Sequence, residues 1–486
     1  MAPLRVRLAI ALGAGTVLAA SCAPVGEYGE VPTEDVCRTH WVGLRGAKPP
    51  TQSRPATVRP PPVSAPGGVF RLVDPPGPTS FSRESYHVVA WVAGRAPPGA
   101  KVRIEESGDG GASFTEIETA DADQGRVVWT VPAAGADRRV LRVVPSWDAR
   151  AARTVDVQLT PSQKASFTWA CITDKTPFHA RTGAGALVHR DRMWLLGGST
   201  PDEFFPRGTT GNDVWSSADG RDWRQEKAQS FVDGEFDDRN DWEGRHDAGY
   251  AVFDDKMWIV GGDALQHHYQ PDVWSSADGR SWTRVADKTP WGERTLHHTL
   301  AFDGRLWVLG GQTTTDLVPD DGASQTAFND VWSSKDGLGW TKVATRGPMW
   351  QPRGAMMQGA VHAGRMWIVG GGVDESVSAS LPDGLFFTDV WSSANGIEWT
   401  QEAVTTPFTP RHHQSVVAWD GRLWVIGGDS GEGRADGAWY STDGRNWYPT
   451  TTPWEGRRSA SVWVYADAIW MAGGGSTDVW RLERSR

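Results

Sequence analysis

The chain has 486 residues, with 28 Trp but only 7 Tyr and 3 Cys. This length predicts several domains, or one large repeat fold beside a smaller domain. The formal net charge of −10 at pH 7 has no basic run behind it, which argues against a nucleic-acid binder.

Residues 1–22 have the pattern of an export signal. Arg5 and Arg7 precede an apolar run from Leu8 to Ala20, which is shorter than a bilayer-spanning helix. The segment ending at Cys22 resembles the lipobox of bacterial lipoproteins, with Ala where that pattern has Leu. The resemblance implies a lipid on Cys22 and a place in the bacterial cell envelope, in the periplasm or at the cell surface. Secretion behind an ordinary signal is the alternative.

Two further cysteines, Cys37 and Cys171, would then remain in an oxidising compartment. They are expected either to form a disulfide with each other or to stay as two separate thiols. Residues 23–66 are rich in Pro and poor in apolar runs, so they are predicted to form an extended tether.

Residues 67–160 contain short β-type runs separated by Gly, Pro and Asp, which predict a β-sandwich. The arrangement resembles the immunoglobulin or fibronectin type III class. A Ser-Gly-Asp-Gly-Gly-Ala-Ser-Phe segment at residues 107–114 resembles the Asp-box turn, which is a structural motif. The predicted strands cover Val69–Val73, Tyr86–Val92, Lys101–Glu105, Phe114–Glu118, Arg126–Val131, Arg139–Val144 and Thr154–Leu159.

One sequence unit recurs six times between residues 166 and 486. It has an apolar run closed by a Gly pair with Trp three residues before the first Gly, then Asp-Val-Trp, then a Ser-x-Asp-Gly turn followed by another Trp. The fifth copy has Gly437-Ala438-Trp439 in place of Asp-Val-Trp. Consecutive apolar residues in the first two strands predict sheets that are buried on both faces, and each unit predicts one four-stranded antiparallel sheet.

The sixth unit lacks a last strand, because the chain stops soon after Trp480. Residues 166–178 parallel the outer strand and following loop of another unit, at residues 281–291. We therefore expect residues 166–172 to supply the outer strand of the sixth sheet and to close the ring.

The double Gly and the two set Trp positions resemble kelch-repeat β-propellers, including the galactose oxidase central domain. The resemblance implies an all-β, six-bladed propeller over residues 166–486. Proteins of this class act as protein-binding modules, carbohydrate oxidases or sialate mutarotases, so the fold leaves the activity open.

The repeat also gives the Trp excess a structural explanation, since eighteen positions belong to the unit. Sugar stacking remains as an alternative for Trp residues in loops, namely Trp242, Trp291, Trp350 and Trp454.

The connections that vary most in length all leave from one face of such a sheet, which makes that face the candidate binding surface. An Arg begins each unit there and could line an anion site or pair with a neighbouring carboxylate. Several His residues lie near the same strand starts. The candidate ligand-binding residues are Arg181, Arg245, Arg294, Arg353, Arg411, Arg457, His298 and His412.

No catalytic residue, metal ligand set or cofactor is expected, because no hydrolase, zinc-helix or phosphate-loop motif occurs. The sequence predicts a non-catalytic binding module for a protein or a glycan, joined to the membrane by its lipid. The alternative is a carbohydrate-active enzyme similar to sialate mutarotases or galactose oxidase.

Overall fold

The computed structural model describes residues 69–200, 209–231, 236–265, 268–313, 326–354, 359–373, 385–430, 433–435 and 437–485. This part of the chain is all-β, built from several small sheets with two short 3₁₀ turns, η1 (Ala122–Gln124) and η2 (Ala149–Ala151). Among these residues no helix is long and apolar enough to cross a membrane. Cys22, Cys37 and the predicted tether lie outside the described residues.

The N-terminal sheet pair, residues 71–160, has a three-stranded sheet of order β1-β3-β6 and a five-stranded sheet of order β2-β8-β7-β4-β5. Side chains from both sheets, such as Trp91 and Ile104, share one apolar core. The structure places strands at all seven predicted segments and adds β2, which pairs in parallel with β8 and has one large apolar residue, Phe81. The strands are β1 (Arg71–Asp74), β2 (Thr79–Ser82), β3 (Tyr86–Val92), β4 (Lys101–Ser107), β5 (Thr115–Asp121), β6 (Arg126–Thr130), β7 (Arg138–Pro145) and β8 (Arg153–Thr160).

The six-sheet region, residues 167–485, has six four-stranded antiparallel sheets among its described residues. In chain order they are β10 (Gly185–His189), β11 (Arg192–Thr200), β12 (Thr209–Ser217) and β13 (Trp223–Lys227); β14 (Gly249–Phe253), β15 (Lys256–Val260), β18 (Val273–Ser276) and β19 (Thr283–Ala286); β20 (His298–Phe302), β21 (Arg305–Leu309), β24 (Val331–Ser334) and β25 (Trp340–Lys342); β26 (Ala360–His362), β27 (Arg365–Val369), β30 (Val390–Ser393) and β31 (Thr400–Ala403); β32 (Ser415–Trp419), β33 (Arg422–Ile426), β36 (Ala438–Ser441) and β37 (Tyr448–Thr450); β38 (Ala460–Tyr465), β39 (Ala468–Gly473), β40 (Val479–Arg484) and β9 (Phe167–Thr173).

Four two-stranded ribbons continue the second to fifth sheets beyond the Gly pairs, at the end where the variable connections leave. They are β16 (Asp263–Leu265) with β17 (His268–Tyr269), β22 (Gln312–Thr313) with β23 (Thr326–Ala327), β28 (Gly372–Val373) with β29 (Leu385–Phe386), and β34 (Asp429–Ser430) with β35 (Gly433–Arg434).

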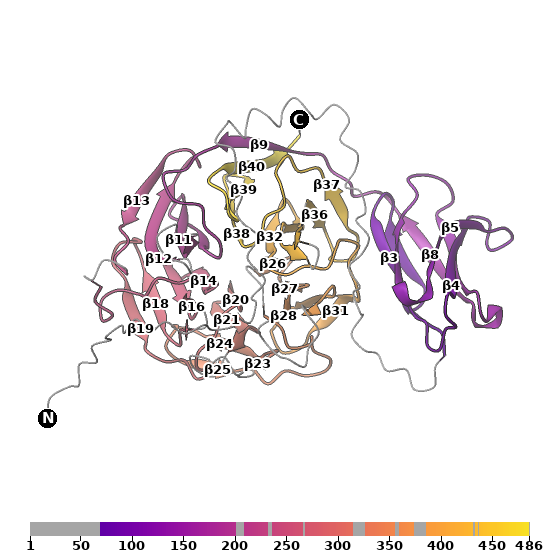
Figure 1. The fold of residues 1–486 in the computed structure, drawn as a ribbon, viewed down its shortest axis with the longest axis horizontal. Helices are drawn as coiled ribbons and strands as arrows, with labels where there is room; N and C mark the ends of the chain where they lie inside the picture. The colour runs from indigo at the N-terminus through magenta and orange to yellow at the C-terminus, as the bar shows by residue number, and fades with distance from the viewer. Residues whose placement is uncertain are drawn as a thin grey trace, which may run out of the picture.

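The first strands of the six sheets lie next to one another in chain order, and the strand of the sixth sheet, β38, also contacts that of the first, β10 (Figure 1). Backbone bonds between left-handed residues join these strands. Asp247 N donates to Gly183 O, Gly183 N to Ser459 O, and Ser459 N to His413 O. The last sheet is therefore bonded to the first as well as to the fifth.

The expected outer strand of the sixth sheet is confirmed. β9 pairs antiparallel with β40, and Trp169 stands opposite Leu482. Residues from the two ends of the six-sheet region thus complete one sheet, which removes an open edge from β40.

Indole groups fill the space between neighbouring sheets, as the repeat predicted. In each second strand, the Trp Nε1 donates to the carbonyl five residues earlier, as from Trp194 to His189 O at 2.9 Å. Five of these rings also pack over a glycine in the third turn of the next sheet. A Cβ on Gly279 would lie 2.2 Å from the Trp194 ring, and one on Gly220 would lie 2.4 Å from the Trp470 ring. The others are Gly337 on Trp258, Gly396 on Trp307 and Gly444 on Trp367.

The sugar-stacking interpretation was wrong for three of the four loop Trp residues, Trp242, Trp350 and Trp454. Trp242 and Trp350 are no more than 1% exposed, and Trp454 is 5% exposed. Each packs against an outer-strand Trp, as Trp350 does against Trp399 with ring centroids 4.4 Å apart. Trp291 packs in the same way on Trp340. The rings of Trp242, Trp350 and Trp454 belong to the packing between sheets, where a sugar has no access. Trp291 is only half-buried, so for this residue sugar stacking stays a prediction.

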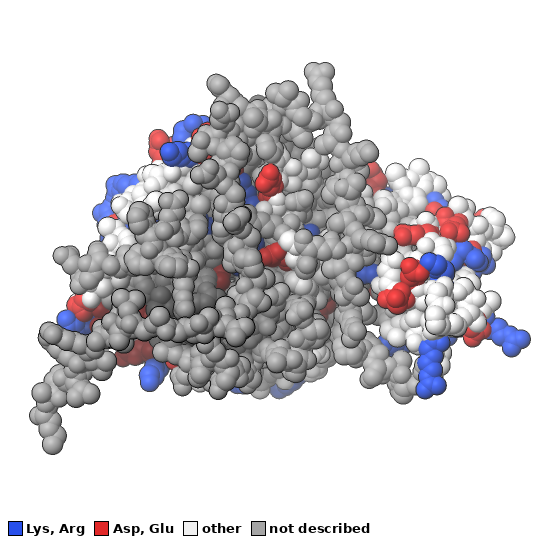
Figure 2. Space-filling model, in the orientation of Figure 1, with Lys and Arg blue, Asp and Glu red and all other residues white. Residues whose placement is uncertain are grey.

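The N-terminal sheet pair contacts the fifth sheet of the six-sheet region. Tyr86 N donates to Trp447 O at 2.9 Å, and the Asn446 side chain accepts from Ser82 N at 2.7 Å and lies 3.0 Å from His87 Nε2. Away from this contact, the sheet pair presents charges of both signs, including the Lys101–Asp121 ion pair (Figure 2).

Candidate functional site

The repeated Arg residues are structural in this geometry. All six are at most 6% exposed, and each Nη1 donates to the carbonyl of the first Gly in its own Gly pair, as Arg245 does to Gly261 O at 3.0 Å. Five also form two-pronged ion pairs with the Asp that precedes Val-Trp. The pairs are Arg181–Asp213, Arg245–Asp272, Arg294–Asp330, Arg353–Asp389 and Arg457–Asp478.

These carboxylates also accept from the Trp two residues later, as Asp272 does from Trp274 Nε1 at 2.7 Å. Burial works to raise the pKa of Asp272, but the Arg245 charge and its hydrogen bonds hold that pKa below the ordinary value. Burial likewise works to raise the pKa of Asp213 and Asp478, but the charge and hydrogen bonds of Arg181 and of Arg457, respectively, hold those pKa values below the ordinary one. The carboxylate-paired interpretation of the Arg set therefore describes these five units better than an open anion site.

The two candidate His residues occupy different places. His298 is 2% exposed and packs beside Gly359, where a Cβ would lie 3.0 Å from its Cγ. Burial and the Arg353 charge lower its pKa to about 3, so it is neutral. His412 instead lies at the ribbon end of the fifth sheet, where Phe386 stacks on its ring at 4.8 Å. The structure does not bring the two into one cluster.

A polar rim surrounds the end of the axis from which the ribbons extend. In each of the first five units, the residue after the repeated Arg forms a backbone bridge with the residue after the Gly pair of the same unit. These bridged residues make up the rim. We call it the axial rim. It consists of Thr182 with Ser199, His246 with Asp263, Thr295 with Gln312, Gly354 with Gly372, His412 with Asp429, and Arg458 from the sixth unit.

Charge in the axial rim is concentrated at two places. His246 Nε2 lies 3.6 Å from Asp247 Oδ2 and 4.0 Å from Asp263 Oδ2, and its Nδ1 lies 2.9 Å from Asp263 O. Burial works to lower the pKa of His246, but the two carboxylates outweigh it and raise that pKa. Arg458 is 45% exposed and lies 3.3 Å from Asp429.

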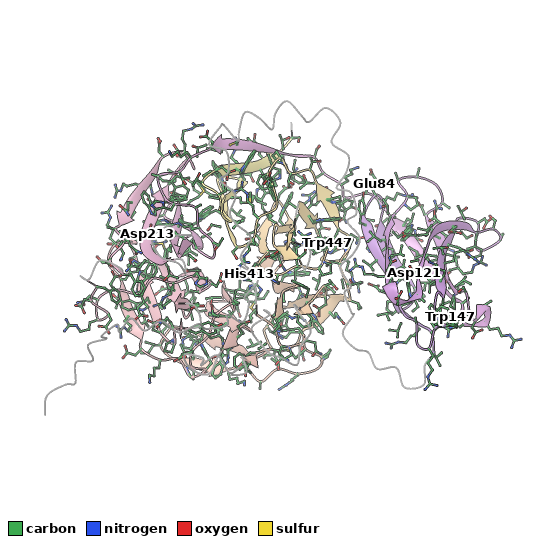
Figure 3. The ribbon with its side chains drawn as sticks, in the orientation of Figure 1. Glu84, Asp121, Trp147, Asp213, His413 and Trp447 are labelled. Atoms are coloured by element: carbon green, nitrogen blue, oxygen red, sulfur yellow. The ribbon has the colours of Figure 1, made fainter. Side chains whose placement is uncertain are left out.

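The charged groups at both places act electrostatically on a third side chain, His413. Figure 3 shows it near the middle of the six-sheet region, whereas Asp213 lies farther out. Its pKa is well below the ordinary value because it is buried, with further lowering by His412, Arg458 and His246. His413 is buried and is not one of the rim residues. The rim itself combines the charge-prone imidazole of His246 with the partly exposed guanidinium of Arg458, groups suited to hydroxyl and carboxylate ligands.

Sequence reasoning missed Asp263, Asp429 and Arg458. A signal was present for Arg458, because the position after the repeated Arg carries Thr, His, Thr, Gly, His and Arg in the six units although the Arg itself is constant. Asp263 and Asp429 stand at another variable position, the one after the Gly pair. Variation at one fixed position marks side chains that the common packing does not need.

Cys171 lies on β9 and is disulfide-bonded. Its predicted partner, Cys37, and the predicted lipidation site, Cys22, lie outside the described residues, so both assignments remain predictions. Within the described ranges no group of three or more His, Cys, Asp or Glu side chains could hold a metal ion.

Comparison with protein-family models finds no match for this chain, and comparison with curated proteins finds none either.

Proposed function

We propose that residues 166–486 form a six-bladed kelch-like β-propeller that acts as a non-catalytic binding module on an exported chain anchored through Cys22. Six four-stranded sheets in cyclic contact, with an Arg, a Gly pair and three Trp positions in shared roles, support this fold. The N-terminal sheet pair, which resembles an immunoglobulin or fibronectin type III domain, is a spacer between the tether and the propeller.

The observation that supports a binding role is that the repeated and the variable residues of each unit have different roles. The repeated side chains are occupied by packing and ion pairs, as Arg245 is by Asp272 and Gly261. The residues that differ between units form the axial rim, in which Arg458 and Asp429 are partly exposed. A rigid scaffold with variable polar groups at one end is a common design for recognition.

The proposed ligand is a protein or glycan surface that presents hydroxyl or carboxylate groups to the axial rim. Arg458 would donate to a carboxylate, while the partly exposed Asp429 would accept from a hydroxyl group. A glycan array and crosslinking to envelope proteins, both with the full chain, would identify it.

In that assay Arg458→Ala is expected to weaken binding at least about tenfold, since a charge-assisted hydrogen bond contributes about 1.5–3 kcal/mol. Lys256→Ala, an exposed change near the opposite end of the second sheet, is the matched control. If both variants lose the same binding affinity, or if Arg458→Ala binds as well as the parent, the axial rim is not the binding surface.

A carbohydrate-active enzyme is the second candidate, and His246 between two carboxylates is the observation that favours it. Incubation with sialic acid and related sugars would test it. Turnover that is lost in His246→Ala would replace the binding-module proposal with catalysis. Arg294→Ala is unsuitable for this test, because Arg294 is buried and paired with Asp330.

The anchor has its own test. Labelled palmitate should enter the full chain and should fail to enter Cys22→Ala. Equal labelling of the two proteins would exclude Cys22 as the lipid site.

A further inference from the structure

The fifth sheet departs from the repeat at two buried positions. In the first four sheets the residue opposite the second-strand Trp is Ser, as Ser275 is opposite Trp258. In the fifth sheet it is Tyr440, opposite Trp424. Its neighbour on the outer strand is Tyr448, where the second, third and fourth sheets have Thr. Both tyrosines are 1% exposed, and each adds a buried hydroxyl group that needs a hydrogen-bond partner.

The partners of both hydroxyls lie outside the repeated unit. Tyr440 Oη accepts from Ala165 N at 2.8 Å and donates to Ala165 O at 3.0 Å. Tyr448 Oη accepts from Gln163 N at 3.1 Å and donates to Arg83 O at 3.2 Å. Gln163 and Ala165 belong to the connection between β8 and β9, and Arg83 follows β2 in the N-terminal sheet pair. The two tyrosines therefore hold the connection and the sheet pair through main-chain groups.

A third departure lies in the turn before the outer strand. The residue before the outer-strand Trp is Asn in the fifth unit alone, at Asn446. Its Nδ2 donates to Asp443 Oδ2 at 2.6 Å, which leaves Oδ1 directed at the sheet pair. Oδ1 accepts from Ser82 N at 2.7 Å and lies 3.0 Å from His87 Nε2. This side chain thus completes the hydrogen bonding of a main-chain donor in the sheet pair.

The sheet pair also contacts the other end of the fifth sheet. Arg126, at the start of β6, donates from Nη2 to Thr406 O at 2.9 Å and from Nη1 to Thr405 Oγ1 at 3.3 Å. Both threonines lie in the connection that leads into the fifth sheet, whereas Asn446 lies in its third turn. Successive connections of an antiparallel sheet alternate between its two ends, so these contacts are at opposite ends. A body held at both ends cannot rock about either one.

Between these ends, the start of β3 meets the outer edge of the fifth sheet. Tyr86 N donates to Trp447 O at 2.9 Å, and the Tyr86 ring contacts the Trp439 ring edge-on with centroids 5.6 Å apart. The sheet pair lies beside the part of the six-sheet region that carries β31, β36 and β37 (Figure 1). Contacts therefore occur at both ends of the fifth sheet and between them.

We propose that the fifth sheet is a dedicated docking site for the N-terminal sheet pair, and that the docked sheet pair and the six sheets form one rigid body. The fifth unit differs from the repeat at the residues that contact the sheet pair or its connection, as a site for one partner requires. The axial rim then keeps a fixed direction relative to β1, the strand that follows the predicted tether. This inference is independent of what the rim binds.

Trypsin cleavage after Lys164 tests the docking in the full chain. The Lys164 side chain is exposed, but the residues on either side of it are bonded to the two tyrosines. Tyr440→Phe with Tyr448→Phe keeps both rings and removes both hydroxyls, so this cleavage should become at least about tenfold faster. Ser333→Ala with Thr341→Ala removes the hydroxyls at the same positions of the third sheet and should leave the rate unchanged.

Spin labels test the rigidity. Labels on Lys101→Cys in the sheet pair and Lys335→Cys in the third sheet, both exposed positions, should give one narrow distance distribution by double electron–electron resonance. Cys22→Ser in the same chain prevents labelling there. Adding Asn446→Ser, which introduces the residue of the second unit, to the two Phe changes should broaden the distribution.

A broad distribution in the chain with an intact fifth sheet would overturn the rigid body. Equal cleavage after Lys164 in the parent, the Phe variant and the third-sheet control would overturn the role of the two tyrosines. A distribution that stays narrow after all three changes would show that the fifth-unit residues do not hold the sheet pair. If the Phe variant does not fold, the distributions of the parent and of Asn446→Ser alone decide.

Discussion

The sixth sheet and the first four share the Arg–Asp pair and the repeated Trp positions, but the chain supplies the strands of the sixth sheet differently. Each of the first five sheets comes from one continuous segment, whereas the sixth joins β38, β39 and β40 to β9 from the start of the six-sheet region. Its Arg457–Asp478 pair and its Trp470 have the same partners as elsewhere. The geometry of a sheet therefore depends on packing positions, and chain continuity is not required.

One contact differs at the junction between the fifth and sixth sheets. In the other junctions a turn glycine covers the second-strand Trp, but Trp424 is covered by Phe167 of β9, with ring centroids 4.7 Å apart. An aromatic ring from a distant segment replaces a local turn. The closing strand thus acts as both the edge of one sheet and the cover of its neighbour.

The largest expected effect comes from removing that strand. Deletion of residues 166–174 should expose the edge of β40 and uncover Trp424, and the cooperative melting transition should move down strongly or disappear. Calorimetry would measure it. An unchanged melting curve would show that β9 adds nothing to the sixth sheet.

Breaking the repeated ion pair compares the sixth sheet with a continuous one. Arg457→Ala and Arg245→Ala should each lower the free energy of unfolding by about 3–5 kcal/mol, because each leaves a buried carboxylate unpaired. Urea denaturation would measure both. A much smaller effect for Arg457→Ala would mean that the sixth sheet is more loosely held than its geometry indicates.

Cys171, on β9, is disulfide-bonded. Cys171→Ser should lower the free energy of unfolding by about 2–4 kcal/mol, since the unfolded chain gains freedom. Peptide mapping without reduction should pair Cys171 with Cys37. A different partner would contradict that assignment without affecting the fold.

Turn glycines test the junctions individually. Gly220→Ala at the sixth-to-first junction and Gly279→Ala at the first-to-second junction should each cost about 1–3 kcal/mol beyond the control, because the new Cβ meets a Trp ring. The control is Gly304→Ala, which has positive φ but open space around it. Thermal unfolding should rank both variants below the control, and equal values would reject the Trp contact as their cause.

The contact between the N-terminal sheet pair and the fifth sheet should depend on pH. Burial lowers the pKa of His87 to about 4, although the hydrogen bond with Asn446 opposes this shift. The unfolded chain binds more protons between about pH 6.5 and 4, so stability from this group is complete above pH 6.5 and is lost as the pH falls.

His87→Gln should reduce the fall in melting temperature between pH 7.5 and 5. Asn446→Ala should lower stability at both pH values, because it removes bonds to Ser82 and His87. If the two variants show the same pH dependence as the parent, His87 does not report on this interface.

Local patterns in the sequence predicted much of the fold. The strands of each unit, the three Trp positions and the outer strand at residues 166–172 follow from short-range alternation, turn residues and repetition. β2 was missed because Thr79–Ser82 has one large apolar residue and pairs with β8 far along the chain. Three loop Trp residues were misread because their partners, such as Trp399 for Trp350, lie on a different segment.

The sequence by itself determined which segments become strands, because hydrogen-bond pairing within a hairpin and the burial of alternate or consecutive apolar side chains are local properties. Only the tertiary structure decided that five of the repeated Arg residues are buried in ion pairs and that the charges of His246 and Arg458 act on the buried His413. Those relationships depend on how separate sheets pack against one another, and the indole rings between the sheets contribute to that packing.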